Sequence, residues 1–303
     1  MSTNKWRGVF PAVTTKFKDN EDLDYAEMEK HYAFQIDSGV HGLVTCGSLG
    51  EASTLSFDEK LEVAKIALQV ADKRLPVLVN VSETRTSNAL RFVQQAADMG
   101  VQGFMVMPSV LYAADAREAK DNLRAIAKAA QLPIMVYNNP VTYKVDLTPE
   151  DFLDLADCEW LVAIKESTDN IRRITDLRNV LGDRYQLFMG VDDLSFEGLA
   201  VGADGLLAGL VVAFPKETVA LYNLMQAKRY DEALKLYQWF MPLLHLDVSN
   251  KLVQNLKLVE TLVGVGNENV RRPRQPLVGA ERERVTAIVQ KALATRPDVS
   301  IYL

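Results

Sequence analysis

Residues 161–167 read Leu-Val-Ala-Ile-Lys-Glu-Ser, an apolar run that ends in two charged side chains. A strand that is apolar throughout, instead of alternating apolar and polar, is typical of a parallel sheet with both faces buried. Seven further short runs have the same character, at residues 8–15, 42–47, 76–82, 103–108, 133–138, 185–190 and 205–210. The chain is therefore predicted to contain eight buried parallel strands.

Segments with the spacing of a helix lie between these runs. Met28, Tyr32 and Ile36 fall on one helical face, and a capping box at residues 56–59 marks the start of another helix. Eight buried strands that alternate with helices predict an α/β protein, a (β/α)8 TIM barrel in preference to an open sheet.

The pattern changes near residue 214, where the strand signals stop. Only helical segments follow, at residues 216–226, 230–245, 249–262 and 279–293. We therefore expect a barrel domain over residues 1–228 and a C-terminal helical domain over residues 229–303. The arginines at 271, 272 and 274 lie in a polar interruption of the helices, which we interpret as a solvated loop or an oligomer contact in preference to a binding patch.

The composition limits the possible partners. A net charge of -6 without a Lys/Arg block argues against a nucleic-acid surface. No stretch approaches the ~20 uninterrupted apolar residues of a membrane span, and the N-terminus lacks a signal-peptide pattern, so we expect a soluble cytoplasmic protein without a membrane partner. Two cysteines and three histidines occur without the spacing of a metal site, so no metal and no cofactor are expected.

Polar residues that end strands point to the site of chemistry, because the carboxyl ends of barrel strands converge on the active site. Lys165 ends the sixth run. An ammonium held there is poorly solvated, which lowers its pKa and makes the amine a usable nucleophile. The alternative is a lysine that extends to solvent or pairs with Glu166 or Asp192.

Two further strand ends support the nucleophile interpretation. Tyr137 ends the fifth run and is either a core aromatic or a phenol that moves protons near the amine. Gly47-Ser48-Leu49-Gly50 follows the second run as a glycine-flanked turn, either a plain connection or a cradle whose backbone N–H groups and hydroxyl bind an anion.

The motifs Gly47-Ser48-Leu49-Gly50-Glu51, Tyr137-Asn138-Asn139-Pro140 and Ile164-Lys165-Glu166-Ser167 resemble the dihydrodipicolinate synthase / N-acetylneuraminate lyase family of class I, lysine-dependent aldolases. The resemblance runs from about residue 8 to the C-terminal helices. It implies a TIM barrel with C-terminal helices and a homotetramer built from two tight dimers.

The resemblance also implies residue roles. Lys165 forms an imine with a 2-oxo acid, Tyr137 acts as acid and base, and Ser48 relays protons to Tyr137. The substrate-binding residues it implies are Gly47, Leu49, Thr142, Ser167, Gly190, Asp192 and Leu207, and Tyr112 is the candidate for reaching a neighbouring subunit's site.

Departures from the family pattern bear on the substrate. In dihydrodipicolinate synthases an arginine binds the carboxylate of the second substrate, and that position is Thr142 here. The turn also has Leu49 in place of a second threonine. The missing arginine argues against dihydrodipicolinate synthesis and favours a substrate with one carboxylate, and Leu49 removes one hydroxyl from the pocket.

The stretch Tyr143-Lys144-Val145-Asp146 and the segments 190–193 and 230–247 resemble a bacterial branch that includes 1-pyrroline-4-hydroxy-2-carboxylate deaminases of hydroxyproline breakdown. This resemblance implies ring opening by Lys165, loss of the 4-hydroxyl, and release of ammonia and 2,5-dioxopentanoate. The alternatives are an aldolase, lyase or dehydratase of a pyruvate-derived 2-oxo acid such as 4-hydroxy-2-oxoglutarate, and a non-catalytic relative that only binds a small molecule.

Overall fold

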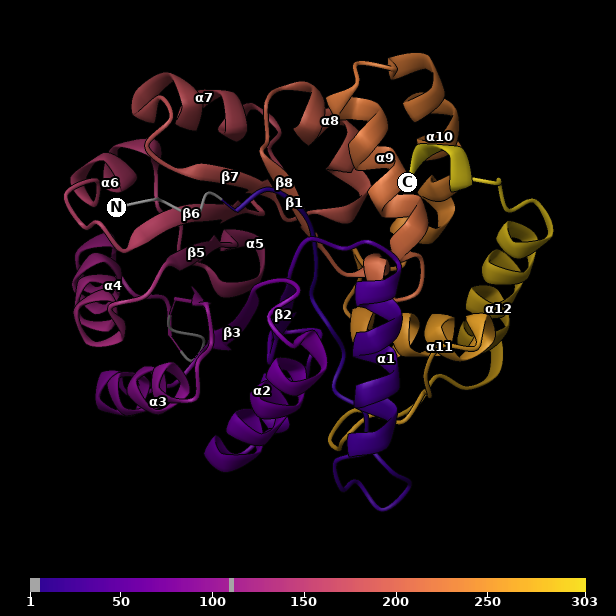
Figure 1. Ribbon diagram of the computed structural model, residues 1–303, viewed down its shortest axis with the longest axis horizontal. Coiled ribbons are helices and arrows are strands. Elements are labelled where there is room, and N and C mark those ends of the chain that lie inside the picture. Colours follow the sequence, from indigo (N-terminus) through magenta and orange to yellow (C-terminus); the bar gives the residue numbers. More distant parts are fainter. Residues whose placement is uncertain (1–5, 109–111) are drawn as a thin grey trace.

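The computed structural model describes residues 6–108 and 112–303. Within them, eight parallel strands form a barrel (Figure 1). The strands are β1 (Gly8–Pro11), β2 (Leu43–Thr45), β3 (Val77–Val81), β4 (Gly103–Val106), β5 (Ile134–Asn138), β6 (Leu161–Glu166), β7 (Gln186–Met189) and β8 (Gly205–Ala208). All eight predicted strands are confirmed, each somewhat shorter than its apolar run, and so is the TIM-barrel class.

Strand order around the barrel follows the chain, because β1 pairs with β8 and each later strand pairs with the next. Between β1 and β2 the ring is closed by a single parallel bridge of Ala12 to Val44, with the Val13 amide donating to the Val44 carbonyl at 3.0 Å. Closure brings the carboxyl ends of all strands to one rim.

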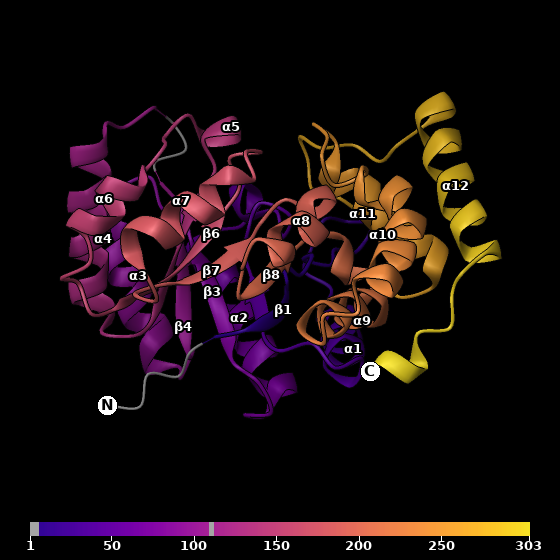
Figure 2. The same cartoon turned by 90° about the horizontal axis from the view of Figure 1, so that it is seen from above.

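Helices surround the strands (Figures 1 and 2). They are α1 (Tyr25–Asp37), α2 (Phe57–Ala71), α3 (Thr86–Asp98), α4 (Ala116–Ala130), α5 (Pro140–Tyr143), α6 (Pro149–Asp154), α7 (Arg172–Leu181), α8 (Ser195–Ala200) and α9 (Pro215–Gln226). The capping box predicted for α2 is confirmed: Ser56 accepts from the Glu59 amide at 3.2 Å, and the Glu59 carboxylate accepts from the Ser56 amide at 2.8 Å. Such caps satisfy amides that the first helical turn leaves unpaired.

The C-terminal helices lie at one side of the barrel, next to α9 (Figure 2). They are α10 (Tyr230–Leu244), α11 (Leu252–Val263) and α12 (Gly279–Ala294). The expected extension is therefore present, while its division from the barrel at residue 228 stays a prediction. No helix among the described residues is both long enough and apolar enough to cross a membrane.

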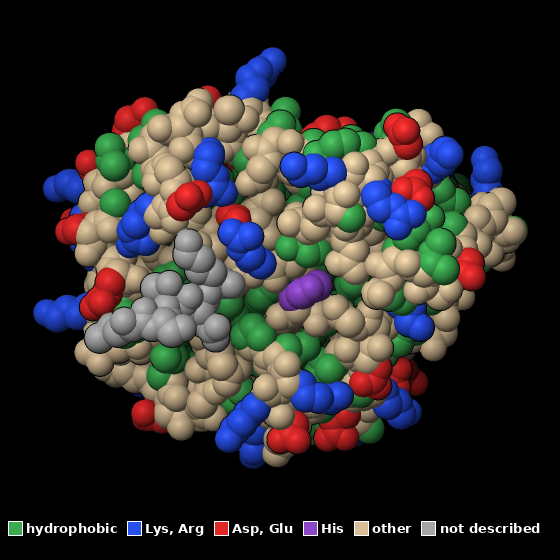
Figure 3. Space-filling model, turned by 45° about the horizontal axis from the view of Figure 1, so that its top comes forward, with side chains coloured by type: hydrophobic (Ala, Val, Ile, Leu, Met, Phe, Trp, Pro, Cys, Tyr) green, Lys and Arg blue, Asp and Glu red, His purple; other side chains and the backbone are tan. Residues whose placement is uncertain are grey.

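Charged side chains of both signs are interspersed on the face shown in Figure 3. This distribution differs from the basic stripe that is typical of a nucleic-acid surface.

Buried ion pairs join α11 to the barrel. Lys257 Nζ lies 2.6 Å from a carboxylate oxygen of Glu51, and Glu260 pairs with Lys16 at 2.7 Å. All four side chains are fully buried. Thr14, just beyond β1, donates a further hydrogen bond to Glu260 at 2.7 Å. Because unpaired buried charge is costly, these contacts fix α11 against the rim of the barrel.

Arg271 belongs to the same region and corrects part of the sequence analysis. Its guanidinium donates to both carboxylate oxygens of Glu59, at 2.8 and 2.9 Å, and its side chain is only 13% exposed. Arg272 is exposed as expected of a solvated loop. Through this bidentate contact, Arg271 links the loop before α12 to helix α2.

Glu260→Gln should lower the free energy of unfolding by about 3–5 kcal/mol, because Lys16 loses its buried partner. Burial alone would raise the pKa of Glu260, but Lys16 and His31 outweigh it and lower that pKa to about 2. The carboxylate therefore contributes stability above its ordinary pKa of 4.5, and this contribution is lost as the pH falls toward 2.

Urea unfolding from pH 3 to 7 measures both effects, with exposed Glu283→Gln on α12 as the matched control. Equal stability of the two variants would contradict a stabilising role for the buried pair.

Candidate active site

The register of β5 and β6 places Tyr137 beside Lys165 and Asn138 beside Glu166. Successive side chains of a strand point to opposite faces. Tyr137 and Lys165 therefore share one face, toward the cavity at the barrel rim, while Asn138 and Glu166 share the other.

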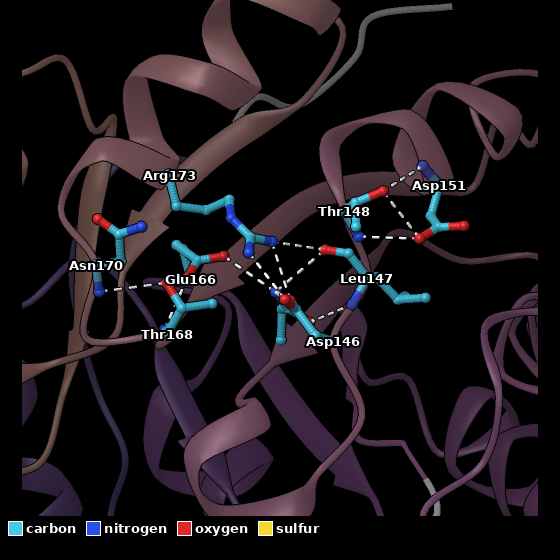
Figure 4. Close-up of polar contacts among 9 residues, drawn as sticks. Asp146, Leu147, Thr148, Asp151, Glu166, Thr168, Asn170 and Arg173 are labelled. Carbon is cyan, nitrogen blue, oxygen red and sulfur yellow. Dashed lines mark hydrogen bonds and ion pairs between the residues drawn. The ribbon is translucent and has the colours of Figure 1, made fainter.

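The outward-facing pair enters a hydrogen-bond network that is drawn in Figure 4. The Asn138 amide nitrogen donates to Asp146 at 3.1 Å and to Glu166 at 3.2 Å. Its amide oxygen accepts from the Leu147 amide at 3.0 Å. Arg173 donates to both oxygens of Asp146, at 2.9 and 2.8 Å. The network fixes the ends of β5 and β6, from which Tyr137 and Lys165 project.

Glu166 therefore makes its hydrogen bonds on the side that faces away from Lys165. This excludes Glu166 as the carboxylate partner of Lys165 and leaves Asp192 as the other candidate. The second oxygen of Glu166 accepts from the Thr168 amide at 2.7 Å. Asp192 remains on the cavity side with the lysine.

Lys165 is buried, with 7% of its surface exposed, and its Nζ lies 4.1 Å from the centre of the Tyr137 ring. Burial lowers its pKa to about 8, against the opposing attraction of Asp247 and Asp192. Roughly a tenth of the amine is therefore neutral at pH 7, far more than at the ordinary lysine pKa of 10.5, and the neutral amine is the form that a nucleophile requires.

A cavity of about 280 Å³ contains this amine. The predicted site residues that line it are Gly47, Ser48, Leu49, Tyr137, Thr142, Lys165, Ser167, Gly190 and Asp192. Leu207 is not among the lining residues: it is fully buried and pairs with Phe10 of β1 inside the sheet. Leu207 was expected here only from the family resemblance. Packing of the strands decides which apolar side chains reach the cavity.

Tyr112 is also placed elsewhere. Its side chain is 57% exposed and lines a separate cavity of about 410 Å³ together with Glu83 and Asn122. Its reach into a neighbouring subunit, and the homotetramer itself, stay predictions.

Gly190 is required by the close approach of two side chains. A Cβ at this position would lie 2.2 Å from the Ser167 hydroxyl and 2.6 Å from Lys165 Cε. The Ser167 hydroxyl has no hydrogen-bond partner among the described residues. A bound ligand in the cavity could supply that partner.

The hydroxyl groups of Tyr137, Tyr143 and Ser48 lie around the same cavity. Asn139 donates to the Tyr137 hydroxyl at 2.9 Å. The Tyr137 and Tyr143 rings pack edge to face, with their centres 5.9 Å apart. The Tyr143 hydroxyl is hydrogen-bonded to Ser48 at 2.5 Å. Burial raises the pKa of Tyr137 to about 12, so the phenol holds its proton at neutral pH.

Ser48 therefore contacts Tyr143, whereas the sequence analysis expected it to relay protons to Tyr137. Sequence reasoning named Tyr143 only as part of a motif. A signal was present, because Asn139 caps the short helix α5 by accepting from the Thr142 amide at 2.9 Å, and this turn carries Tyr143 back over the rim.

Asp247 is a second lining residue that sequence reasoning did not assign to the site. It lies after α10, beyond the barrel strands, where the strand-end rule gives no signal. Its carboxyl group and that of Asp192 both lie against Gly209, whose amide donates to Asp192 at 2.9 Å and on which a Cβ would lie 2.1 Å from Asp247 Oδ1. Removal from bulk water, and then the neighbouring Asp192, raise the pKa of Asp247 well above its ordinary range.

A buried lysine of lowered pKa beside a protonated phenol, at the carboxyl rim of a barrel, defines a class of protein: a TIM-barrel enzyme that forms a Schiff base with a carbonyl substrate. Comparison with known proteins gives the family. The family model described as dihydrodipicolinate synthetase family matches residues 5–292. The chain belongs to this family, and it is a class I lyase-type enzyme that uses a lysine Schiff base.

Individual relatives agree with this assignment. The 4-hydroxy-tetrahydrodipicolinate synthase of Syntrophobacter fumaroxidans is 30% identical, over 94% of this chain and 98% of the relative. That of Geotalea uraniireducens is 29% identical over the same shares. The crystal structure of dihydrodipicolinate synthase DapA-2 from Bacillus anthracis superposes with a TM-score of 0.91 at 26% identity, covering 94% of this chain and 98% of that one.

The rate of imine formation should depend on pH through Lys165. Because only the neutral amine attacks, the rate constant for imine formation with pyruvate should rise about tenfold per pH unit below the lysine pKa and level off above about 8. Borohydride quenching at successive times between pH 6 and 10 measures the rate. Asp192 and Asp247 face the amine, so the midpoint reports all three groups. A midpoint near the ordinary lysine value of 10.5 would contradict the lowered pKa.

Proposed function

We propose that this protein is a Schiff-base lyase that acts on a short 2-oxo acid with one carboxylate. Lys165 attacks the C2 carbonyl to form the imine, and Tyr137 gives up and takes back the protons that this step and the next require. The observation that supports the proposal is the buried Lys165 amine 4.1 Å from the Tyr137 ring, at the rim of the barrel.

The cavity supports a small substrate with a single negative group. Among the described residues that line it, Lys165 is the only lysine or arginine. The lining also contains the carboxyl groups of Asp169, Asp192 and Asp247, and each of these that is ionised would repel a second carboxylate. The turn at Gly47 to Leu49 is the one place in the lining suited to a carboxylate, through backbone N–H groups.

The relatives named above are 4-hydroxy-tetrahydrodipicolinate synthases, so similarity supports the aldolase-type alternative more than the deaminase interpretation. Their particular activity is less well supported. The position at which the family resemblance places an arginine is Thr142, which lies exposed at the cavity mouth. We therefore favour a pyruvate-type 2-oxo acid other than the dihydrodipicolinate precursor.

A second candidate is deamination of 1-pyrroline-4-hydroxy-2-carboxylate, a cyclic imine with one carboxylate. The observation that favours it is the presence of Asp192 and Asp247 near Lys165 in the cavity lining. A carboxylate there would attract the protonated ring nitrogen. Lys165 would add to the ring C=N and open it by transimination. Incubation with this compound and with 4-hydroxy-2-oxopentanoate, which also has one carboxylate, assayed for ammonia and for pyruvate, separates the candidates: pyruvate alone would contradict deamination.

Lys165→Ala should abolish turnover while leaving the fold intact, because no other lining side chain supplies an amine. Borohydride reduction with pyruvate, followed by peptide mass spectrometry, should locate an adduct on Lys165 of the wild-type protein and none on the variant. Exposed Lys144→Ala serves as the control. An adduct on another lysine, or none on the wild type, would overturn the assignment.

Tyr137→Phe should lower kcat by about 10² or more, since the phenol is the acid and base nearest to the amine. Steady-state kinetics with whichever of the two candidate compounds is turned over measure the change, and circular dichroism checks the fold. A change confined to KM would instead indicate that Tyr137 only binds substrate.

A further inference from the structure

The turn that follows β2 begins and ends at residues whose backbone conformation is unfavourable. Cys46, which precedes the turn, has a φ angle of 58°, and Glu51, which ends it, has a φ angle of 55°. Left-handed backbone is costly for residues other than glycine, because Cβ comes too close to the following carbonyl oxygen. A turn with two such residues keeps its shape only where surrounding contacts hold it.

The shape of this turn leaves backbone N–H groups free at the cavity. Ser48 and Leu49 line the cavity, and in the part of the chain that the structure describes their amides donate to no backbone carbonyl. The amide of Glu51, by contrast, donates to the Ser48 carbonyl at 3.1 Å. Two adjacent free N–H groups are the feature with which the turn can bind a carboxylate.

The barrel holds the turn at Gly50. Thr15, in the loop after β1, donates to the Gly50 carbonyl at 2.7 Å. A Cβ on Gly50 would lie 3.0 Å from the Val13 carbonyl oxygen and 3.2 Å from the Gly47 nitrogen, so the turn packs closely against the end of β1. These contacts do not hold the side chain of the strained residue that follows.

Glu51 is held from outside the barrel. Its side chain is fully buried, and one carboxylate oxygen lies 2.6 Å from Lys257 Nζ of α11. The other oxygen accepts from the Arg271 amide at 3.1 Å. Lys257 is fully buried as well and donates to the Asn269 carbonyl at 2.6 Å. The C-terminal part of the chain therefore supplies both the cation and the backbone donor that Glu51 contacts.

The ion pair opposes the backbone strain at Glu51. A buried carboxylate without a cation is costly, so it would take up a proton or turn toward water. Turning toward water would let the backbone of Glu51 leave the left-handed region and would release the end of the turn. With Lys257 in place, the side chain and the backbone of Glu51 are fixed together.

We propose that Lys257 is a positioning residue for substrate binding: through Glu51 it holds the turn in the shape that directs the Ser48 and Leu49 amides at the substrate carboxylate. Neither Lys257 nor Glu51 is among the cavity-lining residues, so the effect reaches the substrate through the backbone of the turn. The inference rests on the proposed function, because it requires a 2-oxo acid whose carboxylate occupies the turn.

The experiment compares pyruvate with pyruvamide, which has the same ketone but a neutral amide in place of the carboxylate. Both compounds can form an imine with Lys165, and borohydride trapping at concentrations below saturation, followed by mass spectrometry, measures each rate. The ratio of the pyruvate rate to the pyruvamide rate reports recognition of the carboxylate. Any difference in intrinsic reactivity between the two compounds is the same for every variant and cancels.

The test variant is Glu51→Gln/Lys257→Met, which removes both charges and leaves neither partner buried and unpaired. The ratio should fall by about tenfold or more, because the charge-assisted hydrogen bonds from the turn to the carboxylate are weakened. The rate with pyruvamide should change much less, since Lys165 and Tyr137 belong to strands that the substitutions do not touch.

A second variant keeps the test independent of the first. Glu51→Gln alone also removes the ion pair, because burial lowers the pKa of Lys257 to about 8 and the amine can lose its proton once the carboxylate is gone. The same fall in the ratio is expected.

The matched control is Glu260→Gln/Lys16→Met. This pair is equally buried and also joins α11 to the barrel, but its barrel end lies in the loop after β1 and not in the turn. We expect the wild-type ratio in this control, even where urea unfolding shows that it has lost as much stability as the test variant.

An unchanged ratio in the folded test variants, or an equal fall in the control, would overturn the inference alone. Absence of a Lys165 adduct with both compounds in the wild-type protein would overturn the proposed function, and the inference with it.

Discussion

The fully buried ion pair between Lys257 and Glu51 is the contact on which the arrangement of the site depends. Glu51 ends the turn that carries Ser48, and Lys257 belongs to α11. Glu51 also accepts from the Arg271 amide at 3.1 Å, and Lys257 donates to the Asn269 carbonyl at 2.6 Å. Burial lowers the pKa of Lys257 to about 8. The Glu51 carboxylate opposes this shift by stabilising the charged amine.

Because α11 is fixed at the rim, the loop that precedes it is fixed as well. This loop carries Asp247 to the cavity and places it against Asp192. Lys165 and Tyr137 come from the barrel strands, and Asp247 comes from the segment between α10 and α11. The site is therefore shared between the two predicted domains, and the buried pairs that join them position reactive groups as well as stabilising the fold.

The alternation of side chains along β5 and β6 explains how the chemistry is kept in place. Each reactive residue is followed by one that faces away: Asn138 after Tyr137, and Glu166 after Lys165. The outward residues are satisfied by hydrogen bonds, so the strand ends cannot shift without breaking them. Preorganisation of this kind lowers the cost of bringing the amine and phenol to the substrate.

Much of this could be predicted from sequence because it is local. Apolar runs with polar ends identified all eight strands, and the same rule identified Lys165, Tyr137 and Asp192, since parallel strands end at one rim. Leu207, which only the family resemblance implied, is not among the lining residues, because the packing of neighbouring strands decides which apolar residues face the cavity.

Tertiary structure alone decided the partners across the cavity. Asp247 and Asp192, separated by 55 residues in the sequence, both lie against Gly209, and the Ser48 hydroxyl is hydrogen-bonded to Tyr143 and not to Tyr137. Neither contact follows from periodicity, because each depends on where a loop returns after a helix. The sequence by itself determined the barrel through its hydrophobic pattern, and it predicted Lys165 as the nucleophile from its strand end together with the family resemblance. The position of Asp247 at the cavity depends on long-range packing of α11 against the rim.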